Sequence, residues 1–216
     1  AGSTRPLIAI IRGALDVPRL IVSNARLFLS GGRTLPALEI GSAVLELDGD
    51  LAVTGEMVLQ GATLQPASTT AALTVRHGGA GRVTFLTLPT GVTLINQPGA
   101  QLDLSSGISI GFQALLHNQP GGTFTFTSTN AQLSTGSIVS TNTLPGALWN
   151  EGTFVTASNG VHNLALNITN TGLMEIRPGT VEISSGQLFQ TGGELRLAGA
   201  QLNLRRNIFT ERPPLV

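Results

Sequence analysis

The side chains that could do chemistry in this chain are few, because only 11% of its 216 residues are charged. The densest acidic group consists of Glu46, Asp48 and Asp50, with Glu56 close behind. Neighbouring carboxylates can act as an acid and base pair on a glycosidic bond, and they can also bind a calcium ion. Asp48-Gly49-Asp50 is equally typical of a simple turn. The sequence therefore offers one weak calcium candidate, Asp48 with Asp50, and no catalytic residue.

The histidines give no stronger signal. His77, His117 and His162 are the whole supply, and none has a partner at the short spacing of a metal-binding pair. Cysteine is absent, which excludes disulfides, thiolate metal sites and a cysteine nucleophile. No phosphate-binding loop, dinucleotide fingerprint or nucleophile elbow is present. We therefore predict no cofactor and no enzymatic activity.

Charge and hydropathy exclude further classes of partner. Twelve basic and twelve acidic residues give a formal net charge of zero, so the electrostatic signature of nucleic-acid binding is missing. The apolar runs fall well short of the roughly 18 residues that a membrane-spanning helix needs. We expect neither a nucleic-acid partner nor a membrane span.

One short phrase returns at a fixed interval and sets the architecture. It consists of an aliphatic residue, a variable residue and a side chain that can form hydrogen bonds. The copies are Leu148-Trp149-Asn150, Ile168-Thr169-Asn170, Leu188-Phe189-Gln190 and Ile208-Phe209-Thr210. Their third members are 20 residues apart three times in succession, and Asn118 and Asn96 continue the series toward the N-terminus. A period of about 20 residues is typical of a solenoid.

Between these phrases, apolar and polar residues alternate in short runs, as in Val44-Leu45-Glu46-Leu47 and Thr123-Phe124-Thr125-Phe126. This period of two, with Gly or Asn at the corners, predicts all-β structure. A single coil cannot bury its own inner face, so coils must stack on one another. We predict a right-handed parallel β-helix (β-solenoid) of about nine or ten coils of about 20 residues each.

This prediction divides the chain into three parts. Residues 25–204 form the solenoid, with an inserted loop at 141–146. Residues 1–24 form an N-terminal cap or a docking segment, because a solenoid must close its ends. Residues 205–216 contain Pro213-Pro214, which cannot continue a sheet, and form an extended C-terminal tail.

The recurring asparagines have a structural explanation in such a stack. Asn96, Asn118, Asn150 and Asn170 occupy the same place in their coils. Stacked amides can each donate to one neighbour and accept from the other, which satisfies buried polar groups. We predict a structural ladder, and the alternative is a row of ligand-binding amides.

The variable slot of the phrase holds aromatic residues. Trp149, Phe189 and Phe209 would form a stripe that could stack on carbohydrate or contact a partner. The alternative is that these rings cover the core beneath the loop at 141–146.

The last coils also carry several charged side chains. We expect them to form a solvated outer face with ion pairs between coils. The set comprises Glu175, Arg177, Glu182, Glu194 and Arg196.

The phrase of asparagine, glycine and alternating apolar residues at 150–155, with Gly-Ala-x-Leu-x-Leu at 99–104 and 199–204, resembles a known repeat type. It is similar to the β-solenoid repeats of bacterial surface adhesins, the filamentous-haemagglutinin-like and autotransporter-passenger-like families. The resemblance covers roughly 40–204. It implies a secreted and mostly non-enzymatic stalk.

The sequence thus predicts a structural rod that is extracellular or attached to the cell surface. It would be the subunit of a self-assembling surface fibre or a segment of an adhesin stalk, associating end to end through residues 1–24 and 205–216. Glycans are a further candidate partner. The alternative functions are a carbohydrate-binding β-helix module and, third, a polysaccharide lyase or hydrolase.

Overall fold

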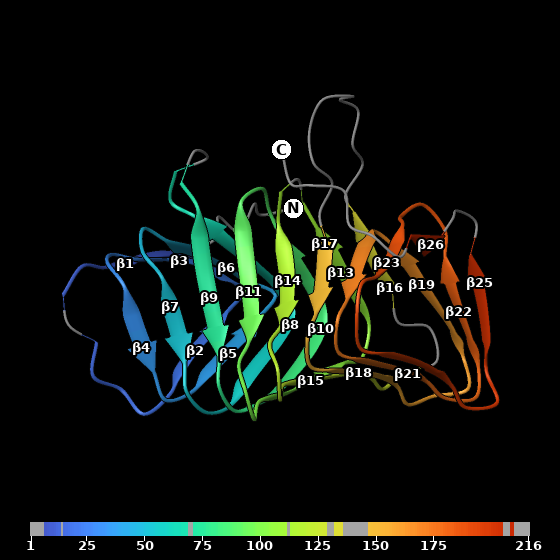
Figure 1. The fold of residues 1–216 in the computed structure, drawn as a ribbon. Coiled ribbons are helices and arrows are strands. Elements are labelled where there is room, and N and C mark those ends of the chain that lie inside the picture. The colour runs from blue at the N-terminus through green and yellow to red at the C-terminus, as the bar shows by residue number, and fades with distance from the viewer. Residues whose placement is uncertain are drawn as a thin grey trace, which may run out of the picture.

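The chain folds as a stack of parallel strands. The computed structural model describes residues 7–13, 15–68, 71–111, 113–128, 132–135, 147–204 and 208–209. Within these ranges all elements are strands, and they form a β-solenoid of about eight turns with roughly 21 residues per turn (Figure 1). No helix long and apolar enough to cross a membrane occurs in this part of the chain. The fold class predicted from the sequence period is confirmed, with slightly fewer turns than expected.

Each turn contributes a strand to three rows, which we call the first, second and third faces. The first face contains β2 (Leu20–Ser23), β5 (Leu38–Gly41), the first halves of β8 (Met57–Pro66) and β10 (Ala80–Leu88), β12 (Gln101–Leu104), β15 (Thr123–Phe126), β18 (Thr153–Thr156), β21 (Leu173–Ile176) and β24 (Glu194–Leu197). The second contains β1 (Leu7–Ile11), β3 (Ala25–Leu29), β6 (Val44–Leu47), the second halves of β8 and β10, β13 (Gly107–Ile110), β16 (Gln132–Thr135), β19 (Val161–Ala165), β22 (Thr180–Ile183) and β25 (Gln201–Leu204).

The third face is a separate nine-stranded sheet. It contains β4 (Arg33–Leu35), β7 (Leu51–Val53), β9 (Leu73–His77), β11 (Val92–Asn96), β14 (Leu115–Asn118), β17 (Ala147–Asn150), β20 (Asn167–Asn170), β23 (Leu188–Gln190) and β26 (Ile208–Phe209). Its nine strands are separated by eight steps, in keeping with about eight turns. The other two faces belong to one sheet because β8 and β10 bend across the corner between them.

The core follows from strand alternation and from register. Successive side chains of a strand point to opposite sides, so every second residue faces inward. On the third face, Leu94, Leu116 and Leu148 are register partners on consecutive strands, and all three are fully buried. On the first face, the buried rings of Phe126 and Phe154 meet edge to face with centroids 5.1 Å apart. The inward residues of all three faces form one continuous cluster.

The corner between the third and first faces requires glycine. A Cβ atom added at Gly152 would overlap the carbonyl oxygen of Gly122, and one added at Gly172 would overlap that of Gly152. Successive coils therefore approach backbone to backbone at this corner. This contact explains why glycine follows the asparagine in the sequence phrase.

Strand pairing does not stop at the boundary expected near residue 24. Strand β1 pairs in parallel with β3, and β2 pairs with β5, so these strands continue the stack. At the other end, Ile208 and Phe209 pair with Leu188 and Phe189. The remainder of the tail at 205–216 and the loop expected at 141–146 lie outside the described residues.

Substitution of a stacked core ring tests this packing. Phe124 is fully buried, so Phe124→Ala should lower the free energy of unfolding by about 3–5 kcal/mol through lost burial and a cavity. Chemical denaturation measures the change. Thr125→Ala is the control, because the neighbouring side chain faces outward and its removal should change stability by less than about 0.5 kcal/mol. Equal effects would contradict the assigned register.

Candidate functional site

A continuous ladder of polar side chains, buried except at its C-terminal end, runs along the inner edge of the third face. The register of β9, β11, β14, β17, β20 and β23 places one polar residue of each strand above the next. The hydrogen bonds along it are His77 Nδ1 to Asn96 Oδ1 (3.0 Å), Asn96 Nδ2 to Asn118 Oδ1 (3.0 Å), Asn118 Nδ2 to Asn150 Oδ1 (2.7 Å), Asn150 Nδ2 to Asn170 Oδ1 (2.7 Å) and Asn170 Nδ2 to Gln190 Oε1 (3.0 Å). The four asparagine amides therefore point along the same direction of the solenoid axis.

The second hydrogen of each amide is also engaged. Nδ2 of Asn118 donates to the Thr153 carbonyl at 3.0 Å, and Nδ2 of Asn150 donates to the Leu173 carbonyl at 3.0 Å. These acceptors belong to the first-face strand of the following coil. The four asparagines predicted to stack do so, and their amides have no remaining donor for a ligand. Asn96, Asn118, Asn150 and Asn170 are all fully buried, so this geometry favours the structural role over a row of ligand-binding amides.

Two other residue types extend the ladder. His77 replaces the amide at the N-terminal end, and Gln190 replaces it at the C-terminal end. The imidazole fits because residue 81 is glycine: a Cβ atom there would lie 2.9 Å from Cε1 of His77. Both residues occupy the third slot of the sequence phrase, which is the signal that could have added them to the predicted ladder.

The outward slot of the same strands holds a second row. His117, Trp149, Thr169 and Phe189 are register partners on β14, β17, β20 and β23. The rings of His117 and Trp149 stack with centroids 4.6 Å apart and planes 9° apart, and Nε2 of His117 lies 2.7 Å from Oε2 of Glu151. One face of the Trp149 indole is therefore covered from within the protein.

This row does not form an open aromatic platform. Phe189 is only 7% exposed, and the side chain of Phe209 lies outside the described residues. The predicted stripe of Trp149, Phe189 and Phe209 shares one row of the fold, since β26 pairs with β23. Of its two described side chains, Trp149 is the more accessible and is half-buried.

The calcium candidates bind protein groups instead of a common centre. Asp48 Oδ1 accepts a hydrogen bond from the backbone nitrogen of Gly31. Asp50 accepts from the backbone nitrogen of Thr74 at 3.1 Å and forms an ion pair with Arg76 at 3.0 Å. The two carboxylates therefore join different coils, as turn residues do.

The nearby glutamates are also paired with other groups. Glu46 lies 2.6 Å from an Arg26 nitrogen, and Glu56 lies 3.2 Å from one of Arg19. In the described ranges, no three His, Asp or Glu side chains gather in a way that could hold a metal ion. The geometry gives no support to a calcium site or to an acid and base pair here.

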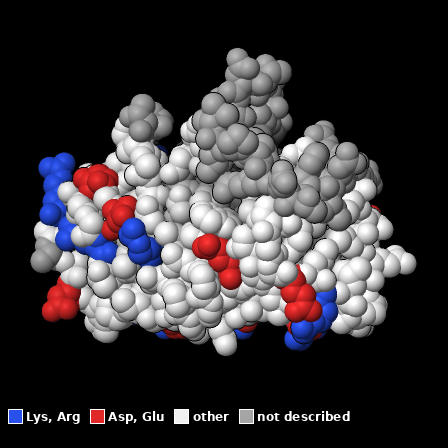
Figure 2. All heavy atoms as spheres, in the orientation of Figure 1, with Lys and Arg blue, Asp and Glu red and all other residues white. Residues whose placement is uncertain are grey.

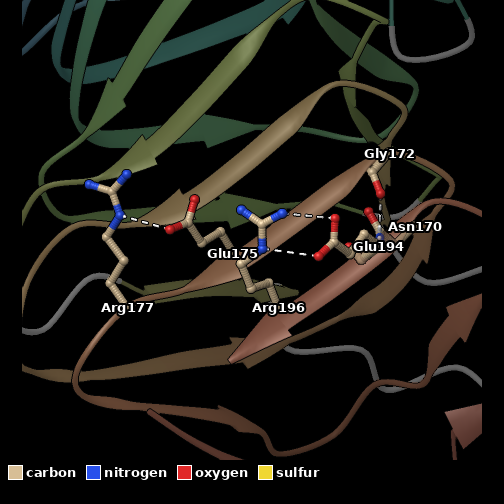
Figure 3. Close-up of polar contacts among 6 residues, drawn as sticks. All are labelled: Asn170, Gly172, Glu175, Arg177, Glu194 and Arg196. Carbon is tan, nitrogen blue, oxygen red and sulfur yellow. Dashed lines mark hydrogen bonds and ion pairs between the residues drawn. The ribbon is translucent and has the colours of Figure 1, made fainter. Parts of the chain in front are cut away.

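The charged residues of the last coils pair differently from the prediction. Arg177 lies 3.3 Å from Glu175, and Arg196 lies 3.0 Å from Glu194. Figure 3 shows both pairs, with Glu194 beside Asn170 of the ladder. Both ion pairs join residues two apart on the same coil, whereas pairs between coils were expected. The exposed hydrogen bond with Glu194 raises the pKa of Arg196.

His162 is a buried titratable side chain that the sequence did not single out as such. It lies on the inner side of β19, with its ring centroid 5.3 Å from that of Phe126. Nε2 lies 3.3 Å from Oγ of Ser158. Burial lowers the pKa of His162 from its usual 6.5, and a contact with the Ser158 backbone partly opposes that shift.

These features together define a class of protein, the parallel β-solenoid, with a core that is apolar except for a polar ladder. No protein-family model, curated protein or solved structure matches this chain.

Removal of one rung tests the ladder. Asn118→Ala should lower the free energy of unfolding by about 2–4 kcal/mol, because Asn150 Oδ1 and Asn96 Nδ2 lose a buried partner. Thr93→Ala on the outer side of β11 is the matched control and should cost less than about 0.5 kcal/mol. A small effect of Asn118→Ala in chemical denaturation would mean that water replaces the amide.

The buried His162 predicts a pH dependence of stability. Because its pKa is lower in the folded state, the unfolded chain binds the proton first as pH falls below 6.5. Stability should then fall with decreasing pH, by at most about 1.4 kcal/mol per pH unit for one proton. In the His162→Gln variant, the thermal melting midpoint should therefore change less with pH between pH 7 and about 5. An unchanged slope in the variant would assign the dependence to other groups.

Proposed function

We propose that this protein is a structural β-solenoid that assembles end to end, as the subunit of a surface fibre or as a segment of an adhesin stalk. The observation that carries the proposal is the unpaired parallel edge at each end of the described stack. Strands β1 and β2 pair only with β3 and β5 among the described strands. At the other end, β24 and β25 pair only with β21 and β22.

The direction of these edges favours a head-to-tail contact. All strand pairs are parallel. Strands β1 and β2 of one copy could therefore pair in parallel with β25 and β24 of another copy. Such a contact joins two different surfaces and leaves one of each free. Repetition of this contact builds an open filament.

Both ends also expose apolar side chains. Near the N-terminal end, Ile8, Ile10 and Ile21 are 64%, 56% and 59% exposed. At the C-terminal end, Leu197 is 49% exposed, and Leu195, Leu202 and Leu204 are only partly buried against the core. Burial of these groups would contribute favourable free energy to association.

The charge distribution is compatible with this contact. Figure 2 shows charged groups of both signs gathered over the N-terminal coils and again near the C-terminal coils, with an acidic group on the surface between them. The net charge of zero adds no repulsion between copies. The absence of excess charge therefore favours assembly of neighbouring rods.

A location outside the cell is part of the proposal, and it rests on the similarity of the repeats to those of secreted adhesins. The proposed role is mechanical instead of enzymatic, and it is supported by the separate partners of Asp48 and Asp50. The exposed fraction of Phe189 gives the aromatic stripe little support as a carbohydrate platform.

Charges placed at the two ends test the assembly. Ala9 is exposed on the inner side of β1, opposite buried Leu27 in the register. Ala9→Lys should block the N-terminal end and Leu197→Lys the C-terminal end. Burial of an unpaired ammonium costs several kcal/mol, so each variant should associate roughly 100-fold more weakly. Sedimentation and electron microscopy measure the assembly.

The two variants also complement each other. A mixture of Ala9→Lys and Leu197→Lys should form one-to-one dimers, because one unaltered end of each kind remains. Thr125→Lys, which adds the same charge in the middle of the first face, should assemble like the parent protein. A parent chain that stays monomeric at every concentration would contradict the proposal.

A further inference from the structure

The corner between the first and second faces contains an unusual residue. Successive coils turn this corner through one residue with a left-handed backbone: Asn24 (φ 50°), Ser42 (φ 49°), Gly61 (φ 63°) and Phe85 (φ 57°). Glycine takes this conformation without cost, and asparagine tolerates it. A bulky side chain disfavours this conformation. Phe85 is therefore strained, whereas Gly61 at the same corner of the preceding coil is not. Strained residues of this kind concentrate at functional sites.

The ring of Phe85 is displayed to solvent. It is 62% exposed, although a phenyl group at a corner could fold onto the core. The next coil has Gly107 at the corresponding place, and a Cβ atom added there would be 4.0 Å from Cδ1 of Phe85. The lack of a side chain at Gly107 therefore leaves free space along one edge of the ring.

This space is a hollow of about 330 Å³ on the second face. Polar side chains line it beside the ring: Thr87 and Ser109 are register partners on adjacent strands, and Gln132 is the register partner of Gly107. Its volume lies at the lower end of the range of about 300–1,000 Å³ for small-molecule sites. No charged residue is among the lining residues.

We propose that this corner hollow binds a neutral carbohydrate. The C–H face of a sugar ring packs on an exposed aromatic ring, and its hydroxyl groups need neutral partners that both donate and accept. Thr87, Ser109 and Gln132 supply two hydroxyl groups and one amide at the edge of the Phe85 ring. The absence of Arg from the lining disfavours phosphate, sulfate and acidic sugars.

The adjacent coils give the site an orientation. Thr63, Thr87 and Ser109 follow one another in register on three consecutive coils, with strands about 4.8 Å apart. An extended oligosaccharide could therefore lie along the solenoid axis, with one sugar on Phe85 and others over the hydroxyl row. The site is distinct from the row of His117 and Trp149 on the third face.

Binding is measured with an array of immobilised neutral and acidic oligosaccharides, followed by titration calorimetry with the strongest neutral hit. Phe85→Gly removes the ring and relieves the strained backbone, so it should keep or raise the melting temperature while weakening binding at least about tenfold. Gly107→Val keeps the ring and fills the hollow from the next coil. The nearest atoms to its Cβ lie 3.9 Å away, so the fold should accept it.

Gln101→Ala is the control, because it removes an exposed amide from the first face and should bind like the parent protein. The titration is repeated with the Ala9→Lys variant, in which assembly is expected to be blocked. Glycan binding is then measured independently of assembly. An array with no neutral hit, or hits on acidic glycans alone, would overturn the proposal. Glycan binding that is unchanged in both Phe85→Gly and Gly107→Val would also overturn the proposal. The same holds if Phe85→Gly alters assembly but not glycan binding.

Discussion

The fold depends on the register between consecutive coils. A single coil of about 21 residues has too few side chains to bury its own inward residues. Each coil is therefore stable only when its inward residues pack on those of the neighbouring coils. A shift by one residue would turn every apolar side chain outward. The amide ladder opposes that shift, because an asparagine moved out of line would lose its partners above and below while still buried. Apolar burial supplies the stability of the stack, and the ladder specifies its alignment.

The coils before His77 achieve alignment in another way. Leu35 and Val53 occupy the ladder position on β4 and β7, so these rungs are apolar. Ion pairs on the outside join these coils instead: Arg19 with Glu39 and Arg26 with Glu46. Exposed pairs of this kind contribute at most about 1 kcal/mol each. The N-terminal coils therefore have the less specific alignment, and that part of the stack also carries the most exposed isoleucines.

The parts of the structure that repeat from coil to coil could be predicted from the sequence. The spacing of Asn150, Asn170 and Gln190 was enough to predict the solenoid, and the position of asparagine before glycine was enough to predict the stacked amides. Features of single coils were beyond its reach. The turn at Phe85 depends on a backbone angle that no sequence pattern predicted, and the outward slot of the phrase gave no sign that Phe189 would be buried. The pairing of Arg196 with Glu194 reflects a local rotamer choice, since Glu175 is also its register neighbour.

The uniform direction of the ladder gives the solenoid a dipole along its axis. Every asparagine donates toward the C-terminal coils and accepts from the N-terminal side, so the amide dipoles add head to tail as they do along a helix. Neighbouring amides polarise one another, which couples distant rungs. In a head-to-tail fibre this dipole would repeat in every copy. The two tips of such a fibre would differ in potential as well as in shape, and monomers would add to them at unequal rates.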